Sequence, residues 1–401
     1  MAASEEREKG WSQALAAVSS NSCEEVARLL ASRPALAAAR DEDGRSLLHW
    51  AAEAGAREAA EALLAAGVTW HELDGRGLSA GELALAAGHG GTFEHLVVRA
   101  SDGERAARGC RGGGEPPPKR ARSAGNDDYL RQQLRFEDGR LVDAAGCGVM
   151  MGWEAPLMAK HAETLTPTGG SDVLNVGFGL GLIDGFLQKM EPRSHTIIEA
   201  HPDVFAEMER QGWLEKQGVV VRRGPWQDIV DHLEPAAFDA VFFDTYEESY
   251  ADVRDFEAHL PRLLRPGGRF SFFNGMASYN IFFHAVYCRM AQDDLRALGF
   301  ACDFLPVEVG PLFDSMWRGI AKRYWKFETY YLPLAVLRPG SAERHGRPRS
   351  ADAESELSTR GAPWRSWPDL AVQVGDRIDA SSDVDEGDEP TEGEAEAQAS
   401  A

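Results

Sequence analysis

The feature that most restricts the fold of this chain is a regular alternation of short apolar stretches with amphipathic ones after Asp128. The amphipathic stretches predict helices at 182–190 and 203–211. The apolar stretches predict strands at 172–176, 196–198, 219–221, 240–243 and, after a Leu-Arg-Pro-Gly-Gly turn, 269–273. Strands that alternate with helices form a parallel sheet covered on both faces. Ligands of such sheets bind where the strands end. The sequence therefore predicts an α/β domain with its site at the carboxyl ends of the strands.

A glycine-rich loop, Gly177-Phe178-Gly179-Leu180-Gly181, follows the first of these strands. Glycines let the backbone turn tightly and let a ligand approach the peptide groups. The spacing differs from the Gly-x-Gly-x-x-Gly loop that places a pyrophosphate on a helix end, and no Gly-Lys-Ser/Thr follows for a nucleoside triphosphate. The loop therefore favours a nucleoside that carries no phosphates.

Three side chains at the ends of later strands are candidates for the same site. Glu199 ends the second strand, 20 residues after the middle glycine, where a carboxylate can accept hydrogen bonds from both hydroxyls of a ribose. Trp226 follows the third strand and could face an adenine ring, and Asp244 ends the fourth strand. Each also has a simpler explanation. Glu199 would then be a solvated acid, Trp226 a core side chain and Asp244 a structural acid.

Residues before the α/β domain repeat with a period near 33. Ala54-Gly55 recurs as Ala87-Gly88, and Leu63-Leu64 recurs as Leu96-Val97. This period, with two short helices per unit, is typical of ankyrin repeats, and residues 43–52 resemble the ankyrin turn and first helix. Because one unit cannot bury its apolar face alone, we expect a small all-α stack. Its role is either contact with another protein or packing as a brace on the α/β domain.

Composition separates the remaining regions. Residues 101–125 carry six Lys+Arg against three acids among many Gly, Pro and Ala residues, which indicates a linker. Residues 376–401 carry ten acids and one arginine, which indicates a disordered acidic tail. We therefore expect four regions, namely ankyrin-like repeats at 1–100, a basic Gly/Pro-rich linker at 101–127, the α/β domain at 128–338 and a C-terminal extension with the acidic tail at 339–401.

Charge restricts the partners and the compartment. The 401-residue chain has 42 Lys+Arg and 64 Asp+Glu, a net charge of −22, which argues against direct nucleic-acid binding and against an anionic membrane. The charged first residues and the absence of a long apolar run predict a soluble cytoplasmic protein, whose five scattered cysteines are reduced. The basic cluster at 118–122 is either a nuclear import signal or an ordinary exposed part of the linker, so the nucleus stays open as a second compartment.

Five ordered segments together resemble the guanidinoacetate N-methyltransferase group of Rossmann-like, S-adenosylmethionine-dependent methyltransferases. They span roughly residues 129–338 and comprise Val149–Glu154, Leu174–Gly179, Ile197–Glu199, Phe243–Tyr246 and Tyr330–Leu334. Small-metabolite members carry Glu at the position of Asn175. The chain is similar instead to the type IV protein arginine methyltransferases at Asn175, Gly181, Glu199-Ala200-His201, Trp226-Gln227 and Phe273-Asn274-Gly275. In that family an ankyrin-like region precedes the catalytic domain. The resemblance thus implies a Rossmann-like methyltransferase domain behind a small all-α ankyrin-like region.

The resemblance also implies a cofactor, S-adenosylmethionine, and the residues that bind it. The matched positions are Tyr129, Met150, Met158, Gly177, Phe178, Gly179, Leu180, Gly181, Leu182, Ile183, Glu199, Ala200, His201, Trp226, Gln227 and Asp244. A methionine offers a soft, adaptable contact to a sulfonium ligand, although methionines more often fill cores. No metal site is expected, because His195 and His201 do not converge and no cysteine supports them.

Glu154 and Asp244 match the two acids that bind the guanidino group in this family. A guanidinium is planar, cationic and rich in donors, so its site needs carboxylates that accept paired hydrogen bonds. The attacking nitrogen must also lose a proton. Asp244 is the expected acceptor of that proton, while Glu154 holds the other edge of the cation. The simpler alternative for Glu154 is a surface ion-pair partner.

The leading hypothesis is a protein arginine N-methyltransferase that monomethylates the delta nitrogen of arginine in a basic protein, and the resemblance implies a ribosomal protein. One alternative is a small-molecule methyltransferase that acts on a guanidinoacetate-like substrate. Another is an ankyrin-bearing interaction protein whose cofactor-binding domain is catalytically silent. The silent protein is disfavoured by the presence of the glycine loop, Glu199, Glu154 and Asp244.

Overall fold

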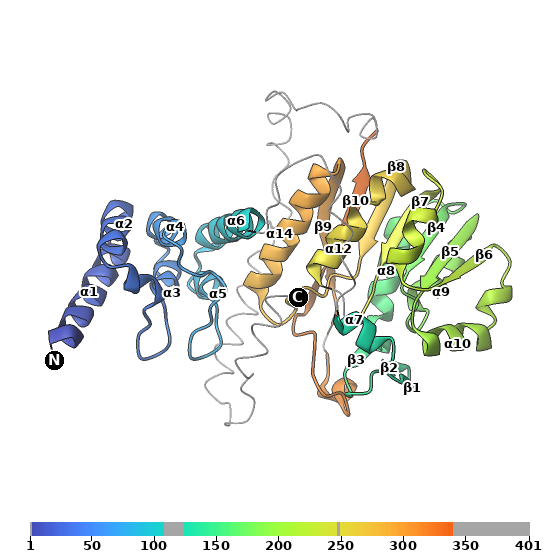
Figure 1. The fold of residues 1–401 in the computed structure, drawn as a ribbon, viewed down its shortest axis with the longest axis horizontal. Coiled ribbons are helices and arrows are strands. Elements are labelled where there is room, and N and C mark those ends of the chain that lie inside the picture. The colour runs from blue at the N-terminus through green and yellow to red at the C-terminus, as the bar shows by residue number, and fades with distance from the viewer. Residues whose placement is uncertain (1, 108–123, 247–248, 311, 340–401) are drawn as a thin grey trace. The chain divides into compact units, whose positions relative to one another are not determined.

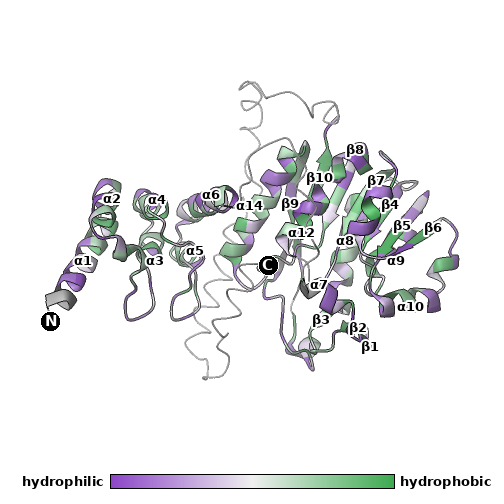
Figure 2. Cartoon of the chain, in the orientation of Figure 1, coloured by the Kyte–Doolittle hydropathy of each residue, from purple (hydrophilic) through white to green (hydrophobic). Residues whose placement is uncertain are grey.

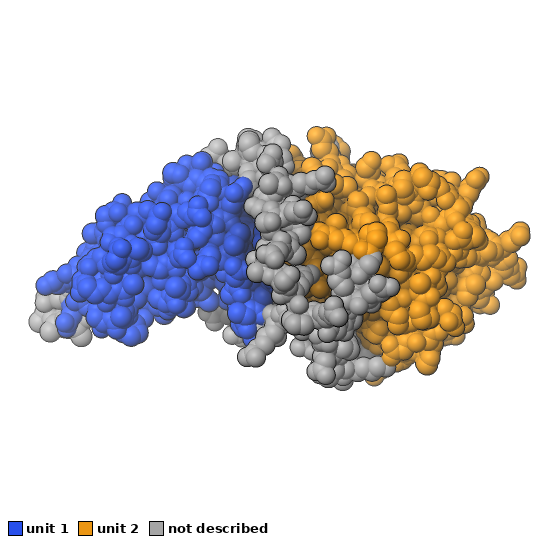
Figure 3. All heavy atoms as spheres, turned by 90° about the horizontal axis from the view of Figure 1, so that it is seen from above, with its two compact units in different colours: residues 1–111, 276–290, 364–388 blue, residues 112–275, 291–363, 389–401 orange. Residues whose placement is uncertain are grey.

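The computed structural model describes residues 2–107, 124–246, 249–310 and 312–339. The chain divides into two compact units (Figure 3). Within the described residues, the first unit comprises 2–107 and 276–290, and the second comprises the rest. Residues 108–123 of the linker expected at 101–127, which include its basic cluster, and the C-terminal extension from residue 340 lie outside the described residues.

The first unit contains an all-helical region, as predicted (Figure 1). Its helices are α1 (Ala2–Ser19), α2 (Cys23–Ser32), α3 (Leu47–Glu53), α4 (Arg57–Ala65), α5 (Ala80–Ala86) and α6 (Gly90–Ala107). Helix α5 begins 33 residues after α3, and α6 begins 33 residues after α4, so the helix pairs repeat with the expected period. The ankyrin-like character of this stack stays a prediction. Helix α6 runs to Ala107, past the boundary expected at residue 100.

A seven-stranded sheet with the order β6-β5-β4-β7-β8-β10-β9 forms the centre of the second unit. Its strands are β4 (Asp172–Val176), β5 (Ser194–Glu199), β6 (Val219–Arg223), β7 (Phe238–Phe243), β8 (Leu264–Phe272), β9 (Phe300–Glu308) and β10 (Thr329–Leu337). Neighbours from β6 to β8 are parallel, whereas β10 is antiparallel to both β8 and β9. The order reverses at β4, and ligands bind at such switch points. This topology confirms the Rossmann-like α/β fold.

Helices accompany this sheet in the alternation that the sequence predicted (Figure 1). They are α7 (Ala124–Tyr129), α8 (Ala155–Leu165), α9 (Leu182–Lys189), α10 (Pro202–Arg210), α11 (Trp226–Ile229), α12 (Tyr250–Glu257), α13 (Leu260–Leu263) and α14 (Ile281–Ala297), which includes residues of both units. Strands β4 and β7 are buried along most of their length and largely apolar (Figure 2). Such strands are what a parallel sheet between two helical layers requires.

Strand β8 begins earlier than expected. We predicted a start at Arg269, but Leu264 already pairs with Phe238 of β7, so the Pro-Gly-Gly turn lies within the strand. The register of the ladder shifts between Phe238 and Ala240. The shift accommodates Pro266, which has no N–H to donate to a neighbouring strand.

A separate antiparallel sheet, β1-β2-β3, comes before the main sheet in the chain. Its strands are β1 (Arg135–Glu137), β2 (Arg140–Val142) and β3 (Gly148–Met151). Strand β3 continues through a single 3₁₀ turn, Gly152–Glu154, directly into α8. Met150 and Glu154 therefore lie on one continuous segment.

Helix α8 is fixed to the main sheet by a buried histidine. His161 Nδ1 lies 2.8 Å from Ser271 Oγ on β8, and its Nε2 lies 2.9 Å from the Tyr330 hydroxyl on β10. Burial lowers the pKa of His161 to about 3, so the ring is neutral and uses one nitrogen as donor and the other as acceptor. Because Glu154 directly precedes α8, these bonds also fix the position of Glu154.

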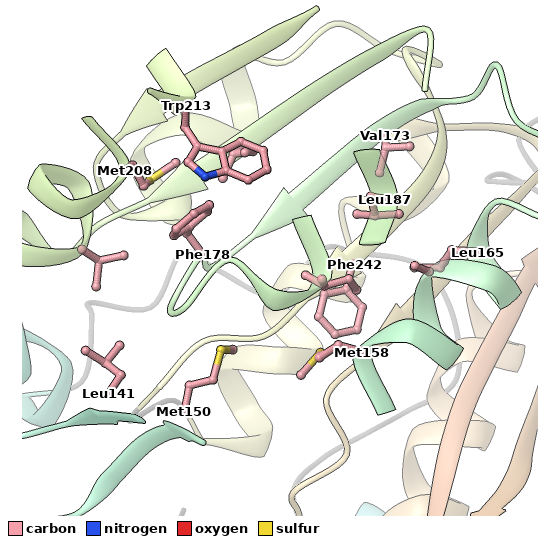
Figure 4. Close-up of a cluster of buried hydrophobic side chains, with 14 of the residues drawn as sticks. Leu141, Met150, Met158, Leu165, Val173, Phe178, Leu187, Met208, Trp213 and Phe242 are labelled. Atoms are coloured by element: carbon pink, nitrogen blue, oxygen red, sulfur yellow. The ribbon is translucent and has the colours of Figure 1, made fainter. Parts of the chain in front are cut away.

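The apolar core of the second unit supports the glycine loop. Phe178 packs edge-on against Trp213, with 5.3 Å between the ring centroids, and Met208 belongs to the same cluster (Figure 4). Met150 and Met158 also belong to it. A loop anchored in a close-packed core holds its shape without a ligand.

Candidate active site

The glycine loop and Asp244 meet where β4 and β7 end. The backbone N–H of Asp244 donates to the carbonyl of Val176, at 2.9 Å. Gly177 has a φ of +93°, and a Cβ built on it would lie 1.8 Å from the carbonyl oxygen of Asp244. Only glycine fits at this point, so the close approach of the two strand ends explains the first glycine of the loop.

Met150 lies directly against the second half of the loop. A Cβ on Gly179 would lie 2.9 Å from the Met150 sulfur, and the Leu180 N–H donates to that sulfur at 3.3 Å. Gly181 precedes α9 in a left-handed conformation. The loop is therefore closed on one side by the segment that leads to Glu154.

Glu199 ties the glycine loop to the end of β5. Its Oε2 accepts the N–H of Phe178 at 2.8 Å, and its Oε1 accepts the N–H of His201 at 2.6 Å. The residue is only 6% exposed, so the alternative of a solvated acid is wrong. Burial raises the pKa of Glu199, and the backbone N–H groups around it act in the opposite direction. Each carboxylate oxygen keeps further acceptor capacity, which two ribose hydroxyls could use.

His201 connects the segment after β5 to Tyr129. Its Nδ1 accepts the N–H of Asp203 at 3.1 Å, and its Nε2 donates to the carbonyl of Tyr129 at 3.2 Å. The Tyr129 ring lies 4.9 Å from the ring of His201 and 4.9 Å from that of Tyr246, centroid to centroid. Tyr129, which precedes the main sheet in the chain, thus lies against residues that follow β5 and β7.

A buried polar network lies beneath the loop. Asn175 Nδ2 donates to the carbonyl of Gly177 at 2.8 Å and to Asp184 Oδ1 at 2.9 Å. The same Asp184 oxygen lies 3.1 Å from His195 Nε2. Sequence reasoning singled out Asn175 only through the resemblance, and it missed Asp184. The signal that could have found Asp184 is its position in the first turn of α9, directly after the glycine loop. Through the bond from Asn175 to the carbonyl of Gly177, this network fixes the backbone of the glycine loop.

Glu154 and Asp244 form the chemically distinctive part of the site. Glu154 is 3% exposed, and its Oε1 accepts the N–H of Met151 at 2.9 Å and the hydroxyl of Tyr324. The surface ion-pair alternative for Glu154 is therefore wrong. Asp244 Oδ2 is buried and accepts no hydrogen bond from any residue that the structure describes.

Burial and neighbouring charges raise the pKa values of both carboxyls. Burial, together with the nearby charge of Asp244, raises the pKa of Glu154 to about 8. Burial and the charge of Asp184 raise the pKa of Asp244 to about 7. Near neutral pH, two acids whose pKa values are raised in this way ionise more readily when a cation lies beside them. The arrangement suits a positively charged group with several N–H donors.

Aromatic side chains surround Glu154 on one side. Trp317 packs edge-on against Tyr324 with 5.0 Å between centroids, and Trp153 lies 6.0 Å from Tyr324 and 6.4 Å from Trp325. Sequence reasoning missed Tyr324 altogether. The available signal was the run from Tyr324 to Phe327, in which three of four residues are aromatic.

Several predicted cofactor residues lie mainly in the core. Met158 is fully buried, and Trp226 packs against Phe243 and Phe256 at 6.0 and 5.2 Å between centroids. Phe178 and Ile183 are buried, whereas the partly exposed positions are Gly177, Gly179, Leu180, Gly181, Leu182, Ala200, Gln227 and Asp244. The cofactor roles of all these residues stay predictions.

Among the residues that the structure describes, no three His, Cys, Asp or Glu side chains are grouped so that they could hold a metal ion. The helices within these ranges also lack the combined length and apolar character that crossing a bilayer requires.

Comparison with known proteins places this site in a family. Residues 133–293 match the family model for guanidinoacetate N-methyltransferase. Protein arginine N-methyltransferase 2 of Aspergillus oryzae is 45% identical over 212 residues, which cover 52% of this chain and 51% of that protein. The protein of the same name from Saccharomyces cerevisiae is 36% identical and covers 53% of each chain.

The matches differ in extent. The chain spans about half the length of these two relatives. The relative from Cryptococcus neoformans var. neoformans, also called protein arginine N-methyltransferase 2, is 33% identical over 329 residues, which cover 74% of this chain and 87% of that protein. Among solved structures, an S-adenosylmethionine-dependent methyltransferase from Mesorhizobium loti aligns with 47% of this chain at 15% identity and a TM-score of 0.34. On the strength of the Cryptococcus match, which extends over most of both proteins, the chain belongs to the protein arginine N-methyltransferase 2 family.

Proposed function

We propose that this chain is an S-adenosylmethionine-dependent protein arginine N-methyltransferase that adds one methyl group to the delta nitrogen of arginine. The observation that carries the proposal is the pair of acids, Glu154 and Asp244, beside the glycine loop at the end of β4 and β7. Membership of the family supports the choice of arginine as acceptor.

The residues at the strand ends fit the cofactor. Gly177 and Gly179 leave the loop without side chains, and Glu199 keeps acceptor capacity for the ribose. Met150 supplies a soft contact at the loop, which suits a sulfonium. When bound, S-adenosylmethionine supplies the methyl group, and its sulfur keeps the electron pair of the broken carbon–sulfur bond.

The paired acids fit the acceptor. An arginine guanidinium keeps its charge at any physiological pH and presents donors along two edges. Bound between Glu154 and Asp244, it would compensate both carboxylates in a poorly solvated site, where the attraction between opposite charges is strong. The unpartnered Oδ2 of Asp244 would then accept one of its N–H groups.

In the proposed reaction, Asp244 takes the proton. As the nitrogen forms its bond to the methyl carbon, it must lose one proton to remain a stable cation of charge +1. A general base works best when its pKa lies near the working pH, and the pKa of Asp244 is raised to about 7. Glu154 holds the other edge of the guanidinium and keeps the nitrogen oriented.

The substrate protein is proposed to be basic, and specifically ribosomal. The net charge of −22 favours a basic partner. The delta nitrogen and the ribosomal substrate rest on the resemblance to the type IV arginine methyltransferases. We further propose that the helical repeats contact a protein partner, and that the reaction takes place in the cytoplasm, with the nucleus as a second compartment.

The decisive experiment is methyl transfer from labelled S-adenosylmethionine to ribosomal proteins and, in parallel, to guanidinoacetate. We expect label in one basic protein, and fragmentation of the product in a mass spectrometer should place the methyl on the internal nitrogen. Label in guanidinoacetate alone would favour the small-molecule enzyme, which the matched family model makes the second candidate. Cofactor binding with no transfer to either would favour the silent interaction protein.

A further inference from the structure

Tyr324 lies in the connection between the 3₁₀ turn Asp314–Trp317 and β10, 170 residues after Glu154 in the chain. Its hydroxyl donates to Glu154 Oε1. The ring is held between Trp317 and Trp153, at 5.0 and 6.0 Å between centroids. A Cβ on Gly148 would lie 3.2 Å from the Tyr324 ring, so the ring also lies directly on β3.

The backbone around Tyr324 is bonded to the small sheet that leads to Glu154. Arg140 of β2 donates to the carbonyl of Arg318 at 2.8 Å. The N–H of Ala321 donates to the carbonyl of Gly146 at 2.8 Å. Both bonds anchor the segment just before Tyr324 and so help to hold its hydroxyl in place relative to Glu154.

The hydroxyl acts on one particular oxygen of Glu154. Both Tyr324 and the N–H of Met151 donate to Oε1, which leaves Oε2 to accept N–H groups of an acceptor. Hydrogen bonds to a carboxylate favour its ionised form. The bond from Tyr324 therefore opposes burial and the charge of Asp244, the two influences that keep Glu154 protonated.

We propose that Tyr324 is a positioning residue, which favours the ionised form of Glu154 and orients it so that Oε2 receives the guanidinium. The proposal rests on the proposed function. The titratable groups that face Glu154 are Asp244 and Tyr324, and Asp184 acts in turn on Asp244. Tyr324 itself stays neutral, because burial and the adjacent acids raise the pKa of its hydroxyl.

The first test is Tyr324→Phe in the full chain, which removes only the hydroxyl. At pH 7 we expect kcat/KM for the arginine acceptor to fall about 10- to 100-fold, the loss typical of one hydrogen bond to a charged group. At pH 9, where a larger share of Glu154 is ionised with or without the hydroxyl, the loss should shrink severalfold. Cofactor affinity and the far-UV spectrum should not change. An equal loss at both pH values, or no loss, would overturn the proposal.

Tyr250→Phe is the matched control. Tyr250 is also a buried tyrosine of the second unit whose hydroxyl donates to a carboxylate, Asp294, at 3.0 Å. The substitution Tyr250→Phe therefore also removes one hydroxyl bonded to a carboxylate, but outside the candidate site. We expect the control to keep the pH profile of the wild-type enzyme, even if its melting temperature falls.

A second measurement does not depend on activity. Thermal unfolding is compared for wild type, Tyr324→Phe, Glu154→Gln and the double variant between pH 6 and pH 9. If Tyr324 acts on ionised Glu154, the destabilisation by Tyr324→Phe grows with pH in the wild-type background and not in the Glu154→Gln background. A destabilisation that is the same in both backgrounds would overturn the proposal. Because this cycle can succeed in a protein that methylates nothing, failure of the proposed function is recognised separately.

Discussion

Replacement of Glu154 by glutamine should make the protein more stable while it abolishes binding of the acceptor. The amide oxygen of glutamine can still accept the N–H of Met151 and the hydroxyl of Tyr324, so both hydrogen bonds survive. The negative charge of the ionised Glu154 carboxylate is lost, because glutamine is neutral. A group that is kept for function and costs stability is common in active sites.

The sign and size follow from the pKa of Glu154. Folding raises it from 4.5 to about 8. Between these values the folded protein holds a proton on Glu154 that the unfolded chain has released, so the contribution of Glu154 to the free energy of unfolding falls as pH rises. At about 1.4 kcal/mol per pKa unit, the cost above pH 8 has a ceiling of about 5 kcal/mol, and relaxation of a buried site reduces it, so we expect about 2 kcal/mol.

Thermal unfolding from pH 5 to pH 9 measures this difference. The advantage of Glu154→Gln over wild type should be small at pH 5 and reach its full value above pH 8, equal to roughly 4–8 °C in melting temperature. Glu163→Gln, an exposed position on α8, serves as control and should show no such trend. A Glu154→Gln variant that is less stable than wild type at every pH would refute the reasoning.

Three further predictions concern the same site. Asp244→Asn should lower kcat/KM for the arginine acceptor by roughly 10²- to 10⁴-fold with cofactor affinity retained, and steady-state kinetics showing a loss below tenfold would contradict its role as base. Gly177→Ala should destabilise the protein by about 2 kcal/mol or more and weaken cofactor binding, because the added Cβ would meet the Asp244 carbonyl. The control Gly185→Ala on α9, where a Cβ meets nothing within 4 Å, should fold normally. Equal melting curves for the two variants would contradict the prediction. KM for the acceptor should fall as pH rises from 6 to 8, by up to about tenfold per pH unit for each carboxyl, because Asp244 and Glu154 must release protons to bind a cation. A KM that does not depend on pH would contradict the paired site.

Features that depend on local sequence were predictable. The alternation of apolar and amphipathic stretches located β4, α9, β5 and α10 within two residues, since each element is short and periodic. The position of acids at the ends of parallel strands also follows from topology, which is why Glu199 and Asp244 could be assigned to one edge of the sheet.

Features that depend on contacts between residues far apart in the sequence could not be predicted. Tyr324 reaches Glu154 across 170 residues, and no local pattern marks that pairing. The early start of β8 depends on the pairing of Leu264 with Phe238 on another strand, which the local Pro-Gly-Gly pattern does not indicate. The burial of Glu199 likewise follows from its backbone partners, which come from the loop after a different strand.

The most direct test of the account is a crystal structure of the full chain with S-adenosylhomocysteine and an arginine peptide from the methylated protein. The account predicts that Asp244 Oδ2 and Glu154 Oε2 each lie within about 3 Å of a guanidinium nitrogen, with the reacting nitrogen facing the cofactor sulfur. A guanidinium bound elsewhere, with both carboxyl groups still pointing only at protein atoms, would contradict it.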